Sequence, residues 1–223
     1  MLSTLKQFSQ RFDPRCRFLN RVKNTENIIE IGCGRGDNLK KLRSISYSAK
    51  FHSIDLLSPA DIPGDVIYRQ VNLDSEPLPY PDNSVDAILL THVIEHLRAP
   101  LSLGIEIRRV LKPDGAIYVE APNSTSILVP SFGFKREQHN PFIFFDDPTH
   151  VHPWTKHGPF AFLQDACHLQ FERVATCRNW RQLPWDFFKI IYRLLTGKRQ
   201  KVISAFRNIY GWCICGIGTK KYQ

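Results

Sequence analysis

The sequence predicts an α/β fold: a doubly wound sheet of seven strands with helices on both faces. Two observations carry this prediction. Short apolar runs bounded by Gly, Pro, Asp or Asn recur along the 223 residues and alternate with segments of helical period. A glycine-rich turn also follows directly on the first run. Strands that alternate with helices favour a largely parallel sheet that is covered on both sides.

Each expected element rests on its local pattern. The strands are short and rich in Ile, Val, Leu or Phe, and they cover 27–31, 50–55, 66–71, 85–91, 115–121, 171–179 and 211–221. The helices show an apolar stripe or a start signal, and they cover 37–45, 99–111, 156–168 and 185–195. Before the first strand, apolar residues among basic ones predict amphipathic helical turns that break near Pro14.

Charge is unevenly distributed along the chain, whose net charge is +9. Residues 1–27 carry +4, residues 28–180 carry −3, and residues 181–223 carry +8. Basic ends around an ordinary core indicate an anionic neighbour, either a membrane surface or nucleic acid. The alternative is a solvated basic surface that only keeps the protein in solution.

The cysteines and the lengths of the apolar runs indicate the cellular compartment of the protein. The six cysteines form no CxxC pair and no regular framework, which is typical of reduced thiols. The N-terminus lacks the apolar run of a signal peptide, and no stretch approaches the ~18 apolar residues of a membrane span. We therefore expect a cytoplasmic protein, with peripheral contact at a membrane surface as the variant that the basic ends suggest.

The turn "NIIEIGCGRGDNL" packs Glu30 and the glycines Gly32, Gly34 and Gly36 into seven positions. A dinucleotide-binding turn reads GxGxxG and presents a helix N-terminus to a pyrophosphate. Here the third glycine comes one residue early, and a carboxylate precedes the first. That carboxylate would repel a pyrophosphate and suits a ligand with an ammonium group, which disfavours an NAD-dependent oxidoreductase.

A second acid, Asp55, ends the second expected strand, 23 residues after Gly32. A carboxylate at this place can accept hydrogen bonds from both hydroxyls of a ribose. Its alternative is an ordinary turn aspartate. Together with the glycine turn, the nucleoside interpretation is favoured.

Two further segments resemble a known family. They read "LPYPDNSVDAILLTHVIEHL" at 78–97 and "RRVLKPDGAIYVEAPN" at 108–123. With the glycine turn and the strand-two acid, they are similar to the class I S-adenosylmethionine-dependent methyltransferases, in particular the small methyltransferase-domain group of type 11/23. The resemblance covers residues 27 to about 121. It implies a Rossmann-like sheet whose last strand is antiparallel.

The resemblance also implies the cofactor, S-adenosyl-L-methionine, with S-adenosyl-L-homocysteine as product. The residues it assigns to the methionine part are those of the turn: Glu30, Gly32, Cys33, Gly34 and Gly36. By the same resemblance, Asp55 would bind the ribose hydroxyls and Leu56 would lie beside the adenine.

The adenine amino group is usually met by an acid after strand three, where three residues compete: Asn72, Leu73 and Asp74. Thr91 and His92, at the end of strand four, should lie close to the sulfonium. The "EHL" of Glu95 and His96 is expected to start and pack a helix.

A base for an oxygen or nitrogen acceptor is sought among the histidines. In "DDPTHVHPW", His150 and His152 would share a face if the segment were extended. His150 is the first candidate base and His152 the second, and the alternative is that His150 only anchors the loop. The two could form half of a metal site, but no third ligand is evident, so no metal is predicted.

Several acceptors are disfavoured by missing motifs. The position after strand four reads "LLTHV" and not the "(D/N)PP(Y/F)" of adenine or cytosine amino methylation, and no cysteine nucleophile in a "PC" context is found. What remains favours a hydrophobic acceptor, because the 122–155 segment is rich in aromatic residues: Phe132, Phe134, Phe142, Phe144, Phe145 and Trp154.

The domain organisation follows from these assignments. We expect a single methyltransferase domain with a basic helical segment at 1–26, a cofactor-binding half at 27–121, a substrate lid at 122–155 and a C-terminal half at 156–223. A basic amphipathic insert at 181–209 could rest on an anionic membrane.

The predicted function is methyl transfer to an oxygen or nitrogen of a small or lipid- or glycan-linked metabolite. The alternatives are an RNA-directed methyltransferase, or a cofactor-binding pseudoenzyme with a basic surface for nucleic acid. Nucleic acid is the less favoured partner. The oligomeric state is not predicted.

Overall fold

The computed structural model describes residues 13–34, 36, 38–39, 48–58, 66–128, 143–196 and 203–221. The helix expected over 37–45 lies outside these residues except at 38–39, which are helical. The part of the N-terminal segment before residue 13 and the centre of the 122–155 segment also lie outside them.

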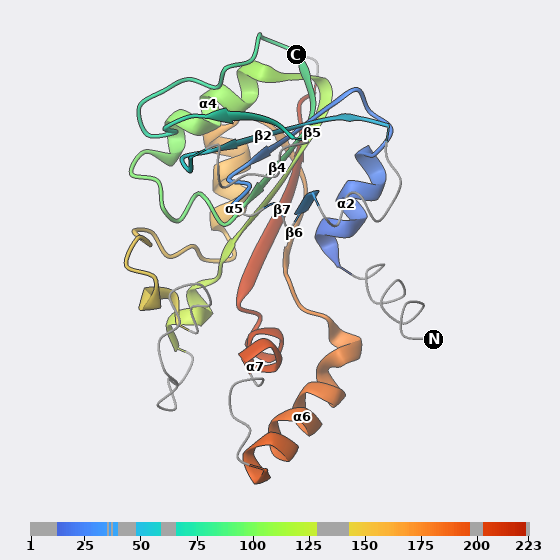
Figure 1. Cartoon of the computed structure of the whole chain (residues 1–223), viewed down its shortest axis with the longest axis vertical. Helices are drawn as coiled ribbons and strands as arrows, with labels where there is room; N and C mark the ends of the chain where they lie inside the picture. Colours follow the sequence, from blue (N-terminus) through green and yellow to red (C-terminus); the bar gives the residue numbers. More distant parts are fainter. Residues whose placement is uncertain are drawn as a thin grey trace.

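The sheet has seven strands in the order β3-β2-β1-β4-β5-β7-β6 (Figure 1). The first five strands are mutually parallel, whereas the last one, β7, is antiparallel to both of its neighbours. The predicted doubly wound sheet with an antiparallel last strand is therefore confirmed. The bounds are β1 Asn27–Ile31, β2 Lys50–Asp55, β3 Ile67–Gln70, β4 Val85–Thr91, β5 Leu111–Pro122, β6 Gln170–Thr176 and β7 Cys213–Thr219.

Five helices of the described chain accompany the sheet, and three of them lie against it. They are α2 Pro14–Val22, α4 Pro100–Val110, α5 Gly158–Ala161, α6 Leu183–Leu195 and α7 Ile203–Tyr210. A π-helical turn, η4 Phe162–Ala166, continues α5, and short 3₁₀ turns occur at Ser124–Leu128 (η2), Phe144–Asp146 (η3) and Trp180–Gln182 (η5).

Pro14 is the first residue of helix α2, and the helical turns expected before it lie outside the described residues. Asp13 caps α2, because its carboxylate accepts hydrogen bonds from the backbone N–H groups of Arg15 and Cys16 at 2.8 and 3.2 Å. Proline suits the first helical position, where its missing N–H would have no partner. Phe18 and Leu19 of α2 are then buried against one face of the sheet, together with Val22.

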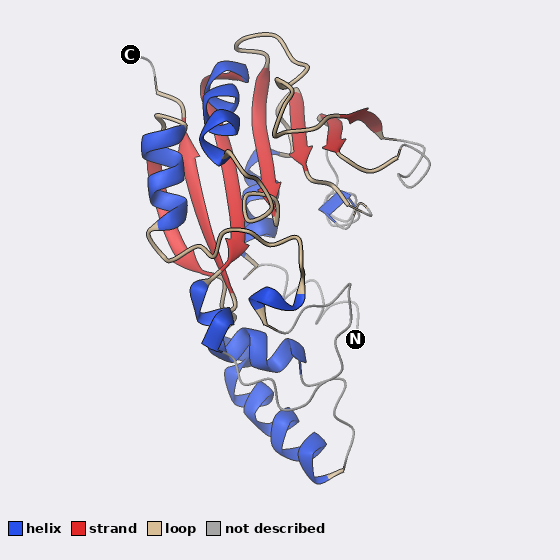
Figure 2. Cartoon of the chain, turned by 90° about the vertical axis from the view of Figure 1, so that its left-hand side faces the viewer, coloured by secondary structure: helices blue, strands red, loops and turns tan. Residues whose placement is uncertain are grey.

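The opposite face is covered by α4 and by η4 (Figure 2). The stripe of α4 that the sequence predicts to be apolar is buried there, and Leu103, Ile107 and Val110 are each at most 2% exposed. The helices thus cover both faces, as expected for a parallel sheet. A core on each side leaves only the ends of the strands free to form a site.

The chain between β6 and β7 forms a helical insert beyond the end of the sheet (Figure 1). It leaves and returns at one point, since the Cys177 N–H donates to the Cys213 carbonyl at 2.8 Å. Within the insert, Asn208 of α7 donates to the buried carboxylate of Asp186 in α6 at 2.6 Å. Because Cys213 pairs with Pro122 at the carboxyl end of β5, the insert lies at the edge where the parallel strands end.

An ion pair ties α2 to the middle of the sheet. Arg15 donates to Glu120 of β5 at 2.5 Å, and the two side chains are only 15% and 8% exposed. Burial alone would raise the pKa of Glu120, but the charge of Arg15 and hydrogen bonds from His92 and Tyr118 hold the pKa well below its usual range.

Replacing Glu120 by Gln should therefore destabilise the protein by about 3 kcal/mol at pH 7, since it leaves the buried Arg15 charge uncompensated. A carboxyl group whose pKa is lowered by folding stabilises above its unfolded pKa, near 4.5, and loses that contribution as the pH falls. The difference in unfolding free energy between wild type and Glu120→Gln should thus narrow from about pH 5 downwards. Urea unfolding at several pH values measures it.

Glu26→Gln is the control, because Glu26 pairs with Lys112 at the surface and is 63% exposed. Glu26→Gln should change the free energy of unfolding only slightly at every pH measured. A Glu120→Gln protein as stable as the control variant at pH 7 would contradict the assignment of this ion pair.

Candidate functional site

The turn after β1 depends on glycine at two positions. Gly32 has φ +74° and its N–H donates to the Ile54 carbonyl of β2 at 2.7 Å. A Cβ at Gly32 would lie 2.0 Å from a methyl carbon of Val93, so no side chain fits. Gly34 has φ +49°, but a Cβ there would meet nothing within 4 Å among the described residues. The backbone is thus open on the side of Gly34, where a ligand can approach.

Asp55, at the end of β2, is joined to this turn. One carboxylate oxygen accepts from the Gly34 N–H at 2.7 Å, and the other accepts from the Leu57 N–H at 3.1 Å. Each oxygen retains a second lone pair that can accept from a ligand hydroxyl. Leu56 is 66% exposed beside it. The structure therefore brings Asp55, Leu56 and the glycine turn together, as the sequence predicts.

The three candidates for the adenine amino group, Asn72, Leu73 and Asp74, have different surroundings in the segment after β3. Asp74 accepts hydrogen bonds from the backbone N–H groups of Arg98 and Ala99 at 2.9 and 3.4 Å, directly before α4. Asn72 is exposed and accepts from the Asp74 N–H, while Leu73 packs against the core. Asp74 thus orders the chain that enters α4.

Beneath the turn lies a buried polar network. Glu30 is 1% exposed and Thr91 is 6% exposed, and the amide of Asn38 donates to both, at 2.6 and 3.0 Å. The oxygen of the Asn38 amide accepts from Arg15 at 2.7 Å, and Arg15 also holds Glu120. Glu30 and Thr91 are therefore positioned by residues that the sequence analysis did not select.

His92 follows β4 in the left-handed region, with φ +56°. Its Nδ1 lies 3.3 Å from Glu95, and its Nε2 lies 3.4 Å from Glu120 and 3.8 Å from the sulfur of Cys213. Burial would lower the pKa of His92, but Cys213 and the two carboxylates outweigh it and raise the pKa well above its usual value. The raised pKa favours the protonated ring, which lies between the two carboxylates.

The chain after His92 forms a turn and not the expected helix start. The His96 N–H donates to the Val93 carbonyl, and the described chain becomes helical only at Pro100. Glu95 is fully buried, and its carbonyl accepts from the N–H groups of Val151 and His152. The turn is therefore held by the distant 150–152 segment.

The two candidate bases do not share a face. His150 is 9% exposed, its Nδ1 donates to the Phe144 carbonyl at 2.6 Å, and its ring packs 4.5 Å from that of Phe144 and 4.7 Å from that of His96. His152 is exposed and lines an open surface groove with Arg98 and Trp154. The two rings therefore lie in different environments, His150 in the interior and His152 at the surface.

Cys33, in the glycine turn, is buried and does not have the properties of a reactive thiol. Burial raises the pKa of Cys33 to about 12, with Asp55 and Glu30 adding to the effect. A thiol with this pKa stays protonated and is a poor nucleophile. All six cysteines are free in the structure, in agreement with the prediction.

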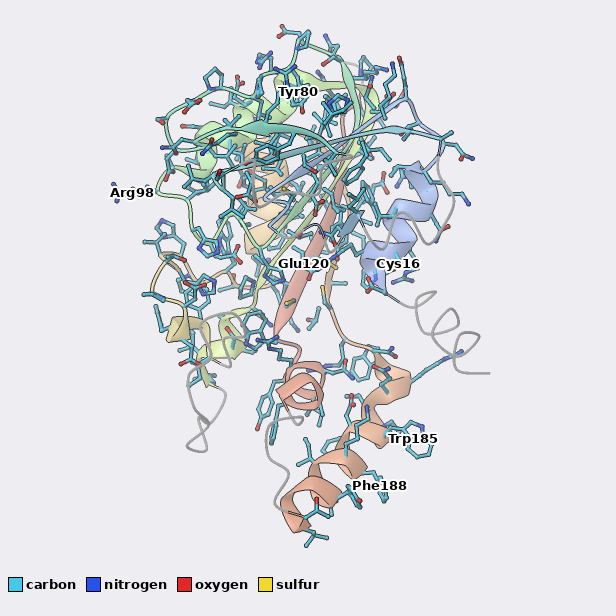
Figure 3. The ribbon with its side chains drawn as sticks, viewed as in Figure 1. Cys16, Tyr80, Arg98, Glu120, Trp185 and Phe188 are labelled. Atoms are coloured by element: carbon cyan, nitrogen blue, oxygen red, sulfur yellow. The ribbon has the colours of Figure 1, made fainter. Side chains whose placement is uncertain are left out.

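The polar groups thus gather where β1, β2 and β4 end: a backbone turn open on one side, a carboxylate with spare lone pairs, and buried acids below. This arrangement can hold a ligand that carries ribose hydroxyls and an ammonium group. Figure 3 shows Glu120 among the side chains that lie between the sheet and α2.

Comparisons with known proteins point to one family. A family model described as a methyltransferase domain matches residues 29–119. A probable methyltransferase of Aspergillus luteorubrus is 28% identical over 114 residues, which are 43% of this chain and 40% of that protein. A probable S-adenosylmethionine-dependent methyltransferase of Mycobacterium tuberculosis is 31% identical over 117 residues, which are 51% of this chain and 39% of that protein. The chain therefore spans about two fifths of the length of these relatives.

A solved structure extends the likeness to nearly the whole chain. The S-adenosylmethionine-dependent methyltransferase of Mesorhizobium loti superposes with a TM-score of 0.62 over 92% of this chain and 97% of its own, at 14% identity. At this identity the likeness shows the fold.

The two glycines allow a test of the turn. Gly34→Ala should destabilise the protein by about 1–2 kcal/mol, the strain of a left-handed alanine, because its Cβ meets no described atom. Gly32→Ala should cost more, since the new methyl group also displaces Val93. Urea unfolding of both variants measures the difference.

Val93→Ala provides the rescue, because it removes the methyl groups that a Cβ at Gly32 would strike. The double variant Gly32→Ala/Val93→Ala should be destabilised by less than the sum of the two single variants. Simple additivity would contradict the close contact of Gly32 with Val93.

Proposed function

Because residues 29–119 form a class I S-adenosylmethionine-dependent methyltransferase domain, we propose that the protein transfers a methyl group to an oxygen or nitrogen of a small or lipid- or glycan-linked acceptor. The observation that carries the proposal is the junction of the glycine turn with Asp55 at the carboxyl ends of β1 and β2. In open α/β sheets, ligands bind at this edge.

The cofactor lies along the ends of the strands in this proposal. Gly32 to Gly36 approach the methionine part, and Glu30 supplies negative charge to its ammonium group. The carboxylate of Asp55 accepts from the ribose hydroxyls, and exposed Leu56 lies beside the adenine. Since Asp74 already serves the N–H groups before α4, Asn72 and Leu73 are the better candidates on the adenine side.

The reaction is an in-line displacement. The S–CH₃ bond of the cofactor breaks, the acceptor forms a bond to the methyl carbon, and the acceptor loses one proton. Thr91 and His92 at the end of β4 lie nearest to the sulfonium in this arrangement. The main task of the protein is to align the two reactants and to exclude water. We expect the acceptor's proton to leave near Glu95, which lies 3.3 Å from His92 and close to the rings of His96 and His150.

The surface of α6 supports a lipid-linked acceptor. Its outward side chains are large, apolar and more than half exposed: Trp185, Phe187, Phe188, Ile191, Tyr192 and Leu195. Trp185 and Phe188 point away from the body of the protein (Figure 3). An exposed apolar helix with Trp and Tyr among basic residues is typical of a segment that lies in a membrane interface. An RNA-binding helix would present basic side chains on this face instead.

Charge next to α6 complements an anionic lipid surface. A groove of about 580 Å³ near the start of the helix is lined by Phe18, Trp180 and several arginines, namely Arg17, Arg21, Arg173, Arg178 and Arg181. Arg178 lies over the ring of Trp180 at 5.0 Å. Residues 181–223 carry nine basic side chains and one acid. Such a surface attracts anionic headgroups.

Among the described residues, no helix is long and apolar enough to cross a membrane. The contact proposed for α6 is therefore a peripheral one.

Titration with S-adenosylmethionine and S-adenosylhomocysteine tests the cofactor site. Asp55→Asn should weaken both affinities roughly 10- to 100-fold, because a neutral amide accepts more weakly from the ribose hydroxyls while it still accepts from the Gly34 N–H. Calorimetry measures the affinities.

The matched control is Asp165→Asn, the same exchange at an exposed position of η4. It should bind both ligands as the wild type does. Absence of binding by the wild type at millimolar ligand would overturn the proposed function.

Flotation with lipid vesicles tests the surface of α6. The wild type should float with vesicles that contain phosphatidylserine at low salt, and less with pure phosphatidylcholine. Trp185→Ser/Phe188→Ser should float at most about one tenth as well, because two anchoring rings are lost.

Leu101→Ser/Ile105→Ser is the control, since it removes equally exposed apolar side chains from α4 (64% and 63%). It should float like the wild type. If the wild type stays unbound at low salt, α6 does not contact an anionic membrane.

A further inference from the structure

A cluster of two imidazoles and one carboxylate lies next to the candidate cofactor site. One ring nitrogen each of His96 and His150 and a carboxylate oxygen of Glu95 lie within 4.8 Å of one another. Glu95 is fully buried, and its Oε2 has no hydrogen-bond partner among the described residues. A buried carboxylate oxygen without a partner carries a large desolvation penalty, which a cation would remove.

The hydrogen bonds around the cluster leave one ring nitrogen of each histidine free to bind a cation. The Phe144 carbonyl can only accept, so Nδ1 of His150 is the donor and Nε2 keeps its lone pair. The Thr149 hydroxyl gives its one hydrogen to Asp147 at 2.6 Å, so it accepts from Nδ1 of His96 at 2.8 Å. Both histidines therefore turn Nε2 away from these partners as an acceptor.

This pattern is the one that metal-binding histidines show. A ligating imidazole usually donates its other N–H to a carbonyl or, through a hydroxyl, to a carboxylate, and this fixes its tautomer and orientation. Here Nδ1 of His150 donates to the Phe144 carbonyl. Nδ1 of His96 donates to the Thr149 hydroxyl, which in turn donates to Asp147. The hydrogen-bond partners of the two histidines are thus those expected around a metal site.

We propose that Glu95, His96 and His150 bind a divalent transition-metal ion. Two imidazoles and one carboxylate suit Zn²⁺, Mn²⁺ or Fe²⁺, whereas Mg²⁺ and Ca²⁺ prefer oxygen ligands. Three ligand atoms at about 2.1 Å from one tetrahedral ion lie about 3.4 Å apart. Separations that reach up to 4.8 Å would therefore have to shorten by as much as about 1.4 Å when the ion binds. His96 is half-buried, which leaves a route from solvent.

A second group of possible ligands does not fit a metal. His92, Glu120 and Cys213 also lie within 4.8 Å of one another. Glu120, however, already has Arg15 at 2.5 Å and accepts from the Tyr118 hydroxyl at 2.5 Å. Glu120 thus has two close partners besides His92, whereas Glu95 has His92 at one oxygen and no partner at Oε2, so a cation gains less beside Glu120.

The proposed ion would take part in the methyl transfer, and this role rests on the proposed function. Glu95 lies 3.3 Å from His92, at the end of β4 where the sulfonium is proposed. Three protein ligands leave coordination positions open. An acceptor hydroxyl that binds there has a lowered pKa and releases its proton to water, and the resulting oxyanion attacks the methyl carbon. His150 then acts as a ligand and not as the base that the sequence suggests.

Cobalt(II) alone, added to the untagged full chain without cofactor, tests the site. One Co²⁺ ion should bind per chain and give visible d–d absorption without a thiolate charge-transfer band. Glu95→Gln and His150→Gln should each weaken the affinity at least about tenfold, and Thr149→Val, which breaks the support of His96, about tenfold.

Two variants serve as controls. His152→Gln changes a neighbouring exposed histidine, and Cys213→Ser removes the sulfur of the second group; both should bind Co²⁺ like the wild type. Circular dichroism checks that every variant is folded. No saturable binding by the wild type, binding that survives Glu95→Gln and His150→Gln, or binding lost with Cys213→Ser would each overturn the proposal.

Titration of the same samples with S-adenosylhomocysteine separates the two proposals. Cofactor binding without Co²⁺ binding overturns the metal site and leaves the methyltransferase proposal intact. Co²⁺ binding without cofactor binding supports the site itself and removes its role in methyl transfer.

Discussion

The site depends on one constraint: the negative charges of its buried carboxylates need partners. Glu30, Glu95 and Glu120 lie at one end of the sheet and are at most 6% exposed. A charge in such surroundings is tolerated only with a partner. Arg15 supplies one for Glu120 and reaches Glu30 through Asn38, and His92 lies between Glu95 and Glu120. The geometry of the strand ends therefore follows from charge pairing as much as from apolar packing.

This constraint explains why a helix outside the methyltransferase-domain match belongs to the site. Arg15 lies in α2, before the matched residues 29–119, yet it contacts both Asn38, just after the glycine turn, and Glu120 near the carboxyl end of β5. Asp13 and Pro14 start α2 at the place that brings Arg15 to Glu120. The segment after residue 143 contributes in the same way, because the N–H groups of Val151 and His152 hold the carbonyl of Glu95.

Local patterns predict the strands and the glycine turn well, since apolar runs and left-handed glycines leave direct signatures in the sequence. All seven strands overlap their expected ranges, and Asp55 meets the turn as foreseen. Contacts between distant residues leave no such signature: Arg15 and Glu120 are 105 positions apart. The environments of His150 and His152 also depend on distant partners, such as the Phe144 carbonyl, that alternation along a strand does not predict. The resemblance predicts a helix start at Glu95, but the carbonyl of Glu95 is held by Val151 and His152, which local patterns around Glu95 do not reveal.

The insert between β6 and β7 is closed at its base by the backbone hydrogen bond from Cys177 to Cys213. Its removal would leave two adjacent antiparallel strands that a tight hairpin could join. The segment is thus a module that can be lengthened, shortened or exchanged while the sheet stays unchanged. A graft of this loop onto another protein of the same fold would transfer its exposed apolar and basic surface as a unit.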